Sequence, residues 1–354
     1  MNNKQDFSNI IKSMSIEEKV AQLFITTPES LAKRDETFTK FDSELEKALS
    51  SVPIGGLIYF GRNLTNPQTT SELLNKTQSY SSDLTGLPLF QCIDEEGGRI
   101  SKVANNSSFG EKNIGPAFEL GKTKDTNYVT EKGQEVGHYL SKLGFNVDFA
   151  PCADVLSNPK NEVIGNRSFS SNPNTVAELA LAFAKGLLTE NIIPSFKHFP
   201  GHGNTDADSH FGYAYTNKTL SELYECELIP FEKGISEGIP MIMIGHISLP
   251  NIVNTNEPAS LSEEIITSLL RNQLGFDGVV ITDSLKMNAI SAIYTSKEAA
   301  IKAIVAGSDI ILRPADFYEA YYGVIDAVKS GILKESRIDE SLQRIFKVKS
   351  LIGN

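Results

Sequence analysis

The sequence predicts a single α/β domain folded as a (β/α)8 TIM barrel. Short apolar runs rich in β-branched residues alternate with amphipathic segments of helical period. Eight such runs occur, and polar or turn-forming residues follow each of them. The chain has 354 residues, a length that α/β barrels with insertions reach as one domain.

The predicted strands are the eight apolar runs. They cover residues 22–26, 56–60, 88–94, 147–150, 193–198, 240–245, 279–283 and 309–312. An open doubly wound sheet would show the same alternation, but the strand count favours a closed barrel. The sequence has no linker, low-complexity tract or internal repeat, so the domain is expected to cover residues 1–354, with 1–14 as an N-terminal arm.

Capping boxes mark the start of several predicted helices. In each box a Ser or Thr hydroxyl and a Glu three residues later accept hydrogen bonds from free backbone amides. The pairs are Ser15/Glu18, Thr219/Glu222, Ser260/Glu263 and Thr295/Glu298. Gly275 and Gly307 follow helical segments, where a left-handed residue commonly ends a helix.

Composition and charge exclude several classes of protein. The formal net charge is −11 and no cluster of Lys and Arg is present, so we expect no nucleic-acid partner. The cysteines Cys92, Cys152 and Cys226 are too few and too scattered for a disulfide framework. The sequence has no secretory signal and no membrane-spanning stretch, so we expect a cytoplasmic protein without a membrane partner. The oligomeric state stays open, and a monomer is compatible with the sequence.

Ionisable side chains are concentrated directly after the predicted strands. In a barrel these strand ends meet on one rim, where the active sites of this fold lie. The residues are 94–99 (DEEGGR), Asp154, Lys197, His198, His246, Asp283 and Arg313. Charged groups on such a rim are costly to desolvate unless they are paired or used, so the rim is expected to carry a functional site.

The segment KHFPGHGNTDADSH, residues 197–210, is the densest part of this set. Its candidate metal ligands are His198, His202, Asp206, Asp208 and His210. The prolines and glycines of the segment predict a turn-rich loop, not the helix on which paired histidine ligands often lie, so we expect no metal. Acid/base chemistry is the competing interpretation, in which His210 exchanges protons and Asp208 orients its imidazole.

Asp283 ends the apolar run GVVITD. A carboxylate held rigidly by a buried strand is well placed to attack an electrophilic carbon. Asp is also a frequent N-cap of a following helix. Spacing alone does not separate these two roles.

Six ordered motifs extend over nearly the whole chain. They are SIEEKVAQLF (15–24), IDEEGGRI (93–100), IGNRSF (164–169), KHFPGHGNTDADSH (197–210), PASLS (258–262) and LGFDGVVITDSLKM (274–287). Together they resemble glycoside hydrolase family 3, and within it the single-domain β-N-acetylglucosaminidases of bacterial cell-wall recycling. The resemblance implies a retaining mechanism in which Asp283 is the nucleophile and His210, paired with Asp208, is first acid and then base.

The same resemblance implies the groups that bind the sugar. It places ligands of the sugar hydroxyls at Asp94, Arg167, Lys197 and His198. Lys102 is a further candidate, because it stands where the family commonly has an Arg. A Lys cannot reproduce the planar two-pronged contact of an Arg, so the contact with the sugar would differ here. We expect no cofactor.

These observations predict an exo-acting, retaining β-N-acetylhexosaminidase. It would release terminal β-linked N-acetylglucosamine from peptidoglycan-derived or chitin-type saccharides, and the lack of tryptophan favours a compact pocket for one sugar. The main alternative is a β-N-acetylglucosaminide phosphorylase, in which phosphate resolves the glycosyl-enzyme at the same residues. The sequence is also compatible with a Schiff-base lyase that uses Lys197 and with a non-catalytic sugar-binding protein.

Overall fold

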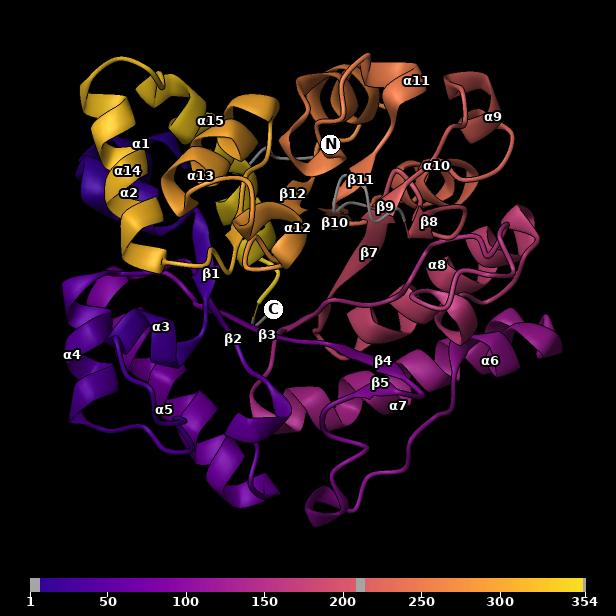
Figure 1. Ribbon diagram of the computed structural model, residues 1–354. Helices are drawn as coiled ribbons and strands as arrows, with labels where there is room; N and C mark the ends of the chain where they lie inside the picture. The colour runs from indigo at the N-terminus through magenta and orange to yellow at the C-terminus, as the bar shows by residue number, and fades with distance from the viewer. Residues whose placement is uncertain (1–6, 208–213, 353–354) are drawn as a thin grey trace.

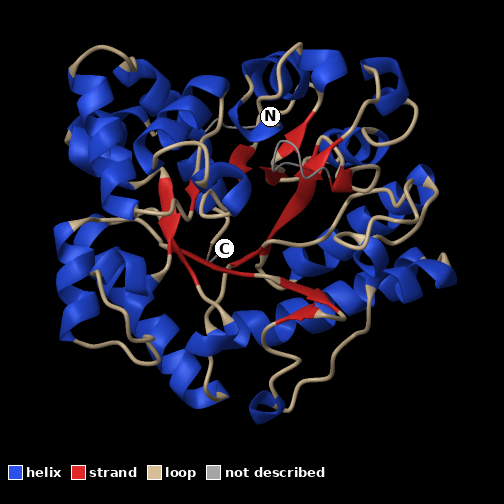
Figure 2. Cartoon of the chain, viewed as in Figure 1, coloured by secondary structure: helices blue, strands red, loops and turns tan. Residues whose placement is uncertain are grey.

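The computed structural model describes residues 7–207 and 214–352. Eight strands form its central sheet: β1 (Phe24–Thr26), β2 (Gly56–Ile58), β3 (Phe90–Ile93), β6 (Val147–Asp148), β7 (Ile193–Phe199), β10 (Met241–Ile244), β12 (Val279–Thr282) and β13 (Ile311–Leu312). Helices surround these strands on the outside (Figure 2). None of the described helices combines the length and the apolar character that a membrane-spanning helix requires.

Hydrogen bonds close the sheet into a barrel. The strand order is β12-β10-β7-β6-β3-β2-β1-β13, and every neighbouring pair is parallel. The two strands at the ends of this order meet through a parallel bridge between Ile281 and Ile310. There the backbone N–H of Thr282 donates to the carbonyl of Ile310 over 3.1 Å. The predicted closed barrel is confirmed, and the open sheet is excluded.

The barrel strands lie inside the predicted apolar runs but are mostly shorter. Every residue of β1, β2, β3, β10 and β12 is buried, as expected for parallel strands covered by helices on one side and barrel contents on the other. β7 is the one barrel strand that is longer than its predicted run, because it continues to Phe199. Residues that follow the strands leave the ladder and turn over the rim of the barrel.

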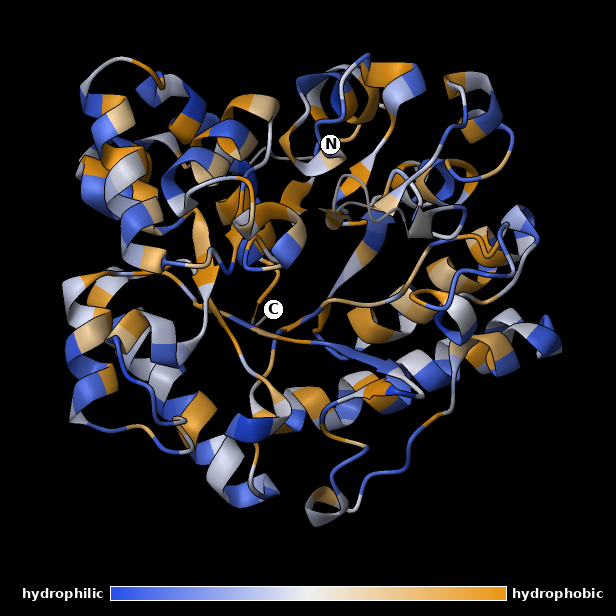
Figure 3. Ribbon diagram, viewed as in Figure 1, coloured by the Kyte–Doolittle hydropathy of each residue, from blue (hydrophilic) through white to orange (hydrophobic). Residues whose placement is uncertain are grey.

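The helices mix hydrophobic and hydrophilic residues, as their alternating colours show (Figure 3), which is typical of helices with one buried side. The α-helices are α1 (Ser8–Ser13), α2 (Ile16–Ala21), α3 (Pro28–Ala32), α4 (Ser43–Ser51), α5 (Pro67–Thr85), α6 (Ala117–Thr123), α7 (Thr126–Leu143), α8 (Pro173–Thr189), α9 (Leu220–Tyr224), α10 (Ile229–Ser236), α11 (Pro250–Val253), α12 (Asn288–Ser291), α13 (Ser296–Ala306), α14 (Phe317–Lys329) and α15 (Glu335–Lys349). Short 3-10 turns occur at η1 (Gly61–Asn63), η2 (Ser107–Phe109), η3 (Gly165–Arg167) and η4 (Ala259–Leu261), and η5 (Glu264–Gln273) is a π-helix.

Three of the four predicted capping boxes are confirmed, at Ser15, Thr219 and Thr295. The fourth prediction, Ser260/Glu263, is wrong. Ser260 is buried in η4, and its hydroxyl lies 2.7 Å from Nδ1 of His246, so it is not available to cap a helix. Gly275 and Gly307 have φ values of 73° and 119° and end η5 and α13, as predicted.

Small sheets extend from the rim of the barrel. β4 (Glu95–Gly97) and β5 (Ile100–Ser101) form an antiparallel hairpin directly after β3. β8 (Asp206–Ala207), β9 (Ala214–Tyr215) and β11 (Ile247–Ser248) form a second sheet from the segments after β7 and β10 (Figure 1). Both additions belong to the end of the barrel where the strands terminate.

The opposite end of the barrel is closed by α15. Lys349 on this helix is fully buried, and its Nζ donates to Oε1 of Gln22 over 2.8 Å. The same ammonium lies 5.1 Å from the centre of the Phe90 ring. The C-terminal end of the strands is therefore the open mouth of the barrel.

Candidate active site

A cavity of about 540 Å³ opens at the C-terminal ends of the barrel strands. Its polar and aromatic lining includes Phe60, Asp94, Glu96, Lys102, Phe149, Arg167, Lys197, His198, His202, Asp283, Ser284, Lys286 and Arg313. All the predicted site residues that the structure describes are in this set. Asp208 and His210 lie outside the described residues.

Separate strands deliver the predicted residues to this cavity. Asp94 directly follows β3, Lys197 and His198 are on β7, and Asp283 directly follows β12. Because parallel strands end on the same rim, residues far apart in the sequence meet there. Arg167 comes from η3, in the loop that follows β6.

Lys197 is at the centre of a buried ion-pair network. Its Nζ lies 2.8 Å from Oδ1 of Asp94 and 2.7 Å from Oε1 of Glu96. Arg167 binds Glu96 with two nitrogens, Nε at 2.9 Å and Nη2 at 2.8 Å. Two-pronged contacts of this kind fix both side chains in one plane.

Pairing keeps these groups charged although they are buried. Burial alone would raise the pKa of Glu96, but Lys197 and Arg167 lower it to about 2. Burial opposes the charge of Lys197, but Asp94 and Glu96 raise its pKa above the ordinary value. A Schiff-base lysine must lose its proton before it attacks a carbonyl. The network therefore argues against the lyase alternative.

The two glutamates of the DEEGGR motif point in different directions. Glu95 is buried and accepts hydrogen bonds from the backbone amides of Val103 and Ala104 at 2.9 and 3.0 Å, and from the Tyr139 hydroxyl at 2.9 Å. Glu95 thus holds the turn after β5, where Lys102 lies, and its neighbour Glu96 faces the cavity.

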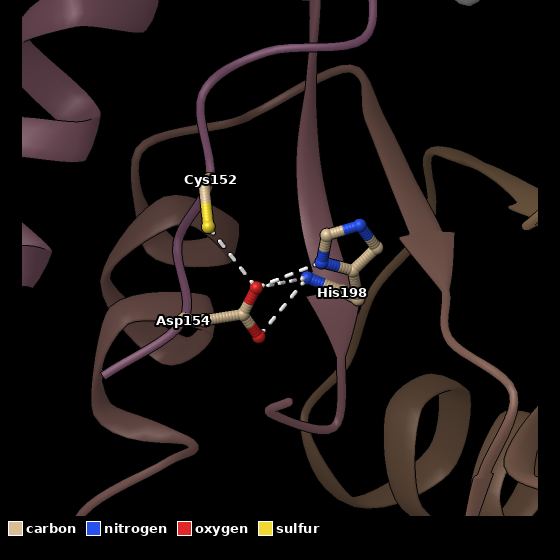
Figure 4. A group of neighbouring side chains, drawn as sticks. All are labelled: Cys152, Asp154 and His198. Carbon is tan, nitrogen blue, oxygen red and sulfur yellow. Dashed lines mark hydrogen bonds and ion pairs between the residues drawn. The ribbon is translucent and has the colours of Figure 1, made fainter. Parts of the chain in front are cut away.

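His198 is oriented by Asp154, as Figure 4 shows. Nδ1 of His198 lies 2.8 Å from Oδ2 of Asp154, and the backbone amide of His202 donates to the other carboxylate oxygen over 2.6 Å. Burial would raise the pKa of Asp154, but His198 lowers it below the ordinary value. An ionised Asp154 holds the proton of His198 on Nδ1 and leaves Nε2, 3.4 Å from the Arg167 guanidinium, facing the cavity.

Cys152 joins this group, and the three side chains have a spacing that a metal ion could use. Their candidate ligand atoms lie within 4.8 Å of one another. The Cys152 thiol, however, donates to Oδ2 of Asp154 over 3.1 Å, and burial raises its pKa well above the ordinary value. Metal ligands need the thiolate. The arrangement therefore fits a hydrogen-bond network around His198 better than a metal centre.

Asp283 lies on the wall of the cavity formed by β12. Its backbone amide donates to Ile244 over 2.9 Å, and one carboxylate oxygen accepts from the amide of Ser284 over 2.6 Å. Burial would raise its pKa, but His246 and His198 lower it, so the group is a carboxylate at neutral pH. The next helix, α12, begins only at Asn288, and Asp283 does not cap it.

Sequence reasoning did not select Glu96, Asp154 or His246 as site residues. His246 is buried, with Nδ1 2.7 Å from the Ser260 hydroxyl and Nε2 3.0 Å from the carbonyl of Ser284. It therefore supports the turn that carries Asp283. All three residues were among the ionisable groups at the strand ends. Their hydrogen-bond and ion-pair partners, which define their roles in the site, are distant in the sequence.

Comparison with known proteins identifies the family. Residues 15–348 match the model of the glycosyl hydrolase family 3 N-terminal domain. The chain belongs to this family. The resemblance to glycoside hydrolase family 3 drawn from the sequence motifs is thereby confirmed.

Several relatives carry more specific names. β-Hexosaminidase A of Pseudoalteromonas piscicida is 37% identical over 336 residues, which are 88% of this chain and 56% of that protein. A family 3 β-N-acetylglucosaminidase from Paenibacillus sp. str. FPU-7 superposes with a TM-score of 0.88 and 33% identity, over 96% of this chain and 62% of that one. This chain thus spans less than two thirds of either protein. The structure of LpqI of M. tuberculosis superposes with a TM-score of 0.83 and 31% sequence identity. The match covers 97% of this chain and 96% of that chain.

Proposed function

We propose that the protein is an exo-acting, retaining β-N-acetylhexosaminidase that releases terminal β-linked N-acetylglucosamine from peptidoglycan-derived or chitin-type saccharides. The observation that carries this proposal is the position of Asp283, an ionised carboxylate on one wall of a cavity whose other walls carry Asp94, Arg167 and Lys197. Names of similar proteins, β-hexosaminidase and β-N-acetylglucosaminidase, support the same activity.

The charged wall suits the recognition of one sugar ring. Carboxylates and cations around Lys197 supply acceptors and donors for hydroxyl groups, and a sugar of the wrong configuration would leave some of them unpaired. Pairing within the network fixes these groups before substrate binds, so little ordering is needed on binding. We assign sugar-hydroxyl contacts to Asp94, Arg167, Lys197 and His198, and a further contact to Lys102.

The proposed reaction has two steps. In the first, a carboxylate oxygen of Asp283 bonds to the anomeric carbon while the glycosidic C–O bond breaks, and His210 gives its proton to the leaving oxygen. In the second, His210 takes a proton from water, the water oxygen bonds to the anomeric carbon, and the bond to Asp283 breaks. Two inversions give net retention. Asp208 orients the imidazole throughout.

The roles of Asp208 and His210 rest on the sequence resemblance. His202, in the same motif, lines the cavity. Burial and the neighbouring His198 lower the pKa of His202, so its imidazole is neutral at neutral pH. The lowered pKa makes His202 a weaker candidate for the proton donor of the first step, a role that the resemblance assigns to His210.

Product analysis tests the proposal. We expect turnover of an aryl β-N-acetylglucosaminide and far slower turnover of the matching aryl β-glucoside. Proton NMR early in the reaction should show the β-anomer of the free sugar, the mark of retention. Early release of the α-anomer, or faster turnover of the glucoside, would contradict the proposal. Sugar 1-phosphate as the main product in phosphate buffer would instead identify a phosphorylase.

A further inference from the structure

A second cavity, of about 670 Å³, adjoins the candidate active site. Lys286 and Arg313 line both cavities, so the two open beside each other. The second cavity lies where β1, β2 and β13 end, since Thr27, Arg62 and Arg313 follow these strands. Ends of β1 and β2 lie beside one another on the rim (Figure 1). A group bound there would be continuous with a sugar bound in the first cavity.

Cations outnumber anions in the lining of this second cavity. The cations are Lys33, Arg34, Arg62, Lys286 and Arg313. The acidic residues are Glu29, Asp35 and Asp316. A cavity with excess positive charge is unusual in a chain whose formal net charge is −11, because that charge would attract cations rather than anions to an average surface.

Two of these acidic groups already accept hydrogen bonds from other parts of the protein. Glu29 is 7% exposed and accepts hydrogen bonds from the amide of Phe38 at 3.0 Å and the side chain of Asn63 at 2.7 Å. Asp316 caps α14 and accepts from the amide of Glu319 over 3.0 Å. These carboxylates hold the backbone in place and also carry negative charge, but together with Asp35 they leave the five cations in excess.

Three of the cations, in contrast, have no acidic side chain within the 4 Å of an ion pair among the residues that the structure describes. Lys33 lies over the Tyr318 ring, with Nζ 3.9 Å from its centre, and the guanidinium of Arg313 lies 4.6 Å from the centre of the Phe60 ring. Lys286 is exposed at the border of the two cavities. Ring contacts orient Lys33 and Arg313 and leave their N–H groups available to donate.

The cations also lie close enough to influence one another. Burial lowers the pKa of Arg313, and the nearby Arg62 lowers it further. Within residues 7–207 and 214–352, Arg62 has one acidic contact, Nη2 to Oε2 of Glu29 at 3.4 Å, and its side chain is 50% exposed. An anion placed between the two guanidinium groups would remove their repulsion and accept several N–H donors at once.

We propose that this second cavity binds an anionic substituent, a carboxylate or a phosphate ester, carried by the saccharide whose terminal N-acetylhexosamine occupies the first cavity. The anion would lie between Arg62 and Arg313, with Lys286 and Lys33 around it. The inference rests on the proposed function for the position of the sugar. The anionic substituent is carried either by the leaving group or by the bound sugar itself. Matched substrates distinguish these two positions.

Matched substrates test the inference in two arms. In the leaving-group arm, an aryl β-N-acetylglucosaminide with a para-carboxylate is compared with the same compound as para-carboxamide. In the sugar arm, 4-nitrophenyl β-N-acetylglucosaminide is compared with its 6-phosphate. We expect the anionic member of one arm to have a kcat/KM about 5- to 20-fold higher, a preference that shrinks in 0.5 M NaCl. Equal values in both arms would overturn the inference.

Variants assign the preference to this cavity. Arg62→Gln and Lys33→Gln each remove a charge from residues that line only the second cavity. Each should reduce the preference for the anionic substrate about 3- to 10-fold and leave turnover of the neutral substrate unchanged. Lys76→Gln, on the exposed face of α5, changes net charge equally and should leave the preference intact. An unchanged preference in both test variants would place the anion elsewhere.

Binding without turnover separates this inference from the proposed function. Thio-linked analogues of the same substrate pairs resist hydrolysis, so calorimetric titration measures their affinity whether or not the protein is a hydrolase. Turnover of neutral substrates with no anion preference in rate or affinity would refute the inference alone. Selective binding of the anionic analogues with no turnover of any substrate would refute the proposed function alone.

Discussion

Lys197 and Glu96 form a 2.7 Å ion pair in which the two side chains are only 3% and 4% exposed. Such a pair adds little stability by itself, since the cost of desolvating both charges offsets their attraction. Its main effect is to hold fixed charges at the cavity wall. Losing one partner is costly, however, because the other charge stays buried without compensation.

The first prediction follows from that asymmetry. Glu96→Gln should lower the free energy of unfolding by about 3 kcal/mol, since Lys197 and Arg167 lose their shared carboxylate. Urea unfolding monitored by circular dichroism measures the change. Glu111→Gln, at an exposed carboxyl, is the matched control and should change stability by less than about 0.5 kcal/mol. A loss at Glu96 as small as in the control would contradict the buried network.

The same pair predicts a pH dependence of stability. The pKa of Glu96 in the folded protein is about 2, against an ordinary value of 4.5. A carboxyl with a lowered folded pKa contributes stability that is fully present above the ordinary value and is lost as pH falls toward the folded value. The stability difference between wild type and Glu96→Gln should therefore be constant near neutral pH and shrink between pH 4.5 and 2. A difference that stays constant into this acid range would show that Glu96 is not held ionised by its partners.

The sequence was sufficient to predict the barrel because each strand is buried on both faces and therefore reads as an apolar run with a polar end. Strand lengths were overestimated, since a residue such as Asp94 continues the apolar run in sequence but already turns over the rim. Ser260 was assigned to a capping box because its local pattern fits one. Its hydroxyl instead contacts His246, and a local pattern carries no information about such a distant partner.

For the site, the sequence predicted which residues meet but not how they pair. Asp94, Lys197, His198 and Asp283 stand at strand ends, so the fold alone brings them to one cavity. Pairings within the cavity were not predictable, because each joins different strands or loops: Glu96 with Lys197, and Asp154 with His198. Arg167 was named from the motif IGNRSF, and only the structure shows that it reaches Glu96.

The nucleophile assignment predicts a large loss of activity without loss of the fold. Asp283→Asn preserves size and removes the charge that would attack the anomeric carbon, so kcat should fall about 10⁴- to 10⁶-fold. Asp277→Asn is the matched control in the same motif, because its carboxyl is exposed and does not line the cavity. Turnover of the Asp283 variant near the wild-type rate, with an unchanged circular dichroism spectrum, would remove the central assignment.

Proton donation by His210 predicts a dependence on the leaving group. His210→Gly should slow turnover about 10²- to 10⁴-fold for a poor leaving group such as a sugar, which needs a proton to depart. An activated 4-nitrophenol leaving group needs little protonation, so its loss should be much smaller. The exposed His138, changed to Gln, is the control and should affect neither substrate. Equal losses on the two substrates in the His210 variant would argue against an acid role.

Orientation of His198 by Asp154 gives the last prediction. Asp154→Asn removes the anion that holds the His198 proton on Nδ1, so a larger share of the imidazole should carry its proton on Nε2. Nitrogen-15 NMR of histidine-labelled protein detects that change of tautomer, and kcat/KM should fall about 10- to 100-fold because the nitrogen facing the sugar would change from acceptor to donor. Cys152→Ser keeps a donor to the same carboxylate and should alter neither readout strongly. If Asp154→Asn lowers kcat/KM while the nitrogen signals of His198 stay in place, Asp154 acts on the fold of the loop rather than on the imidazole.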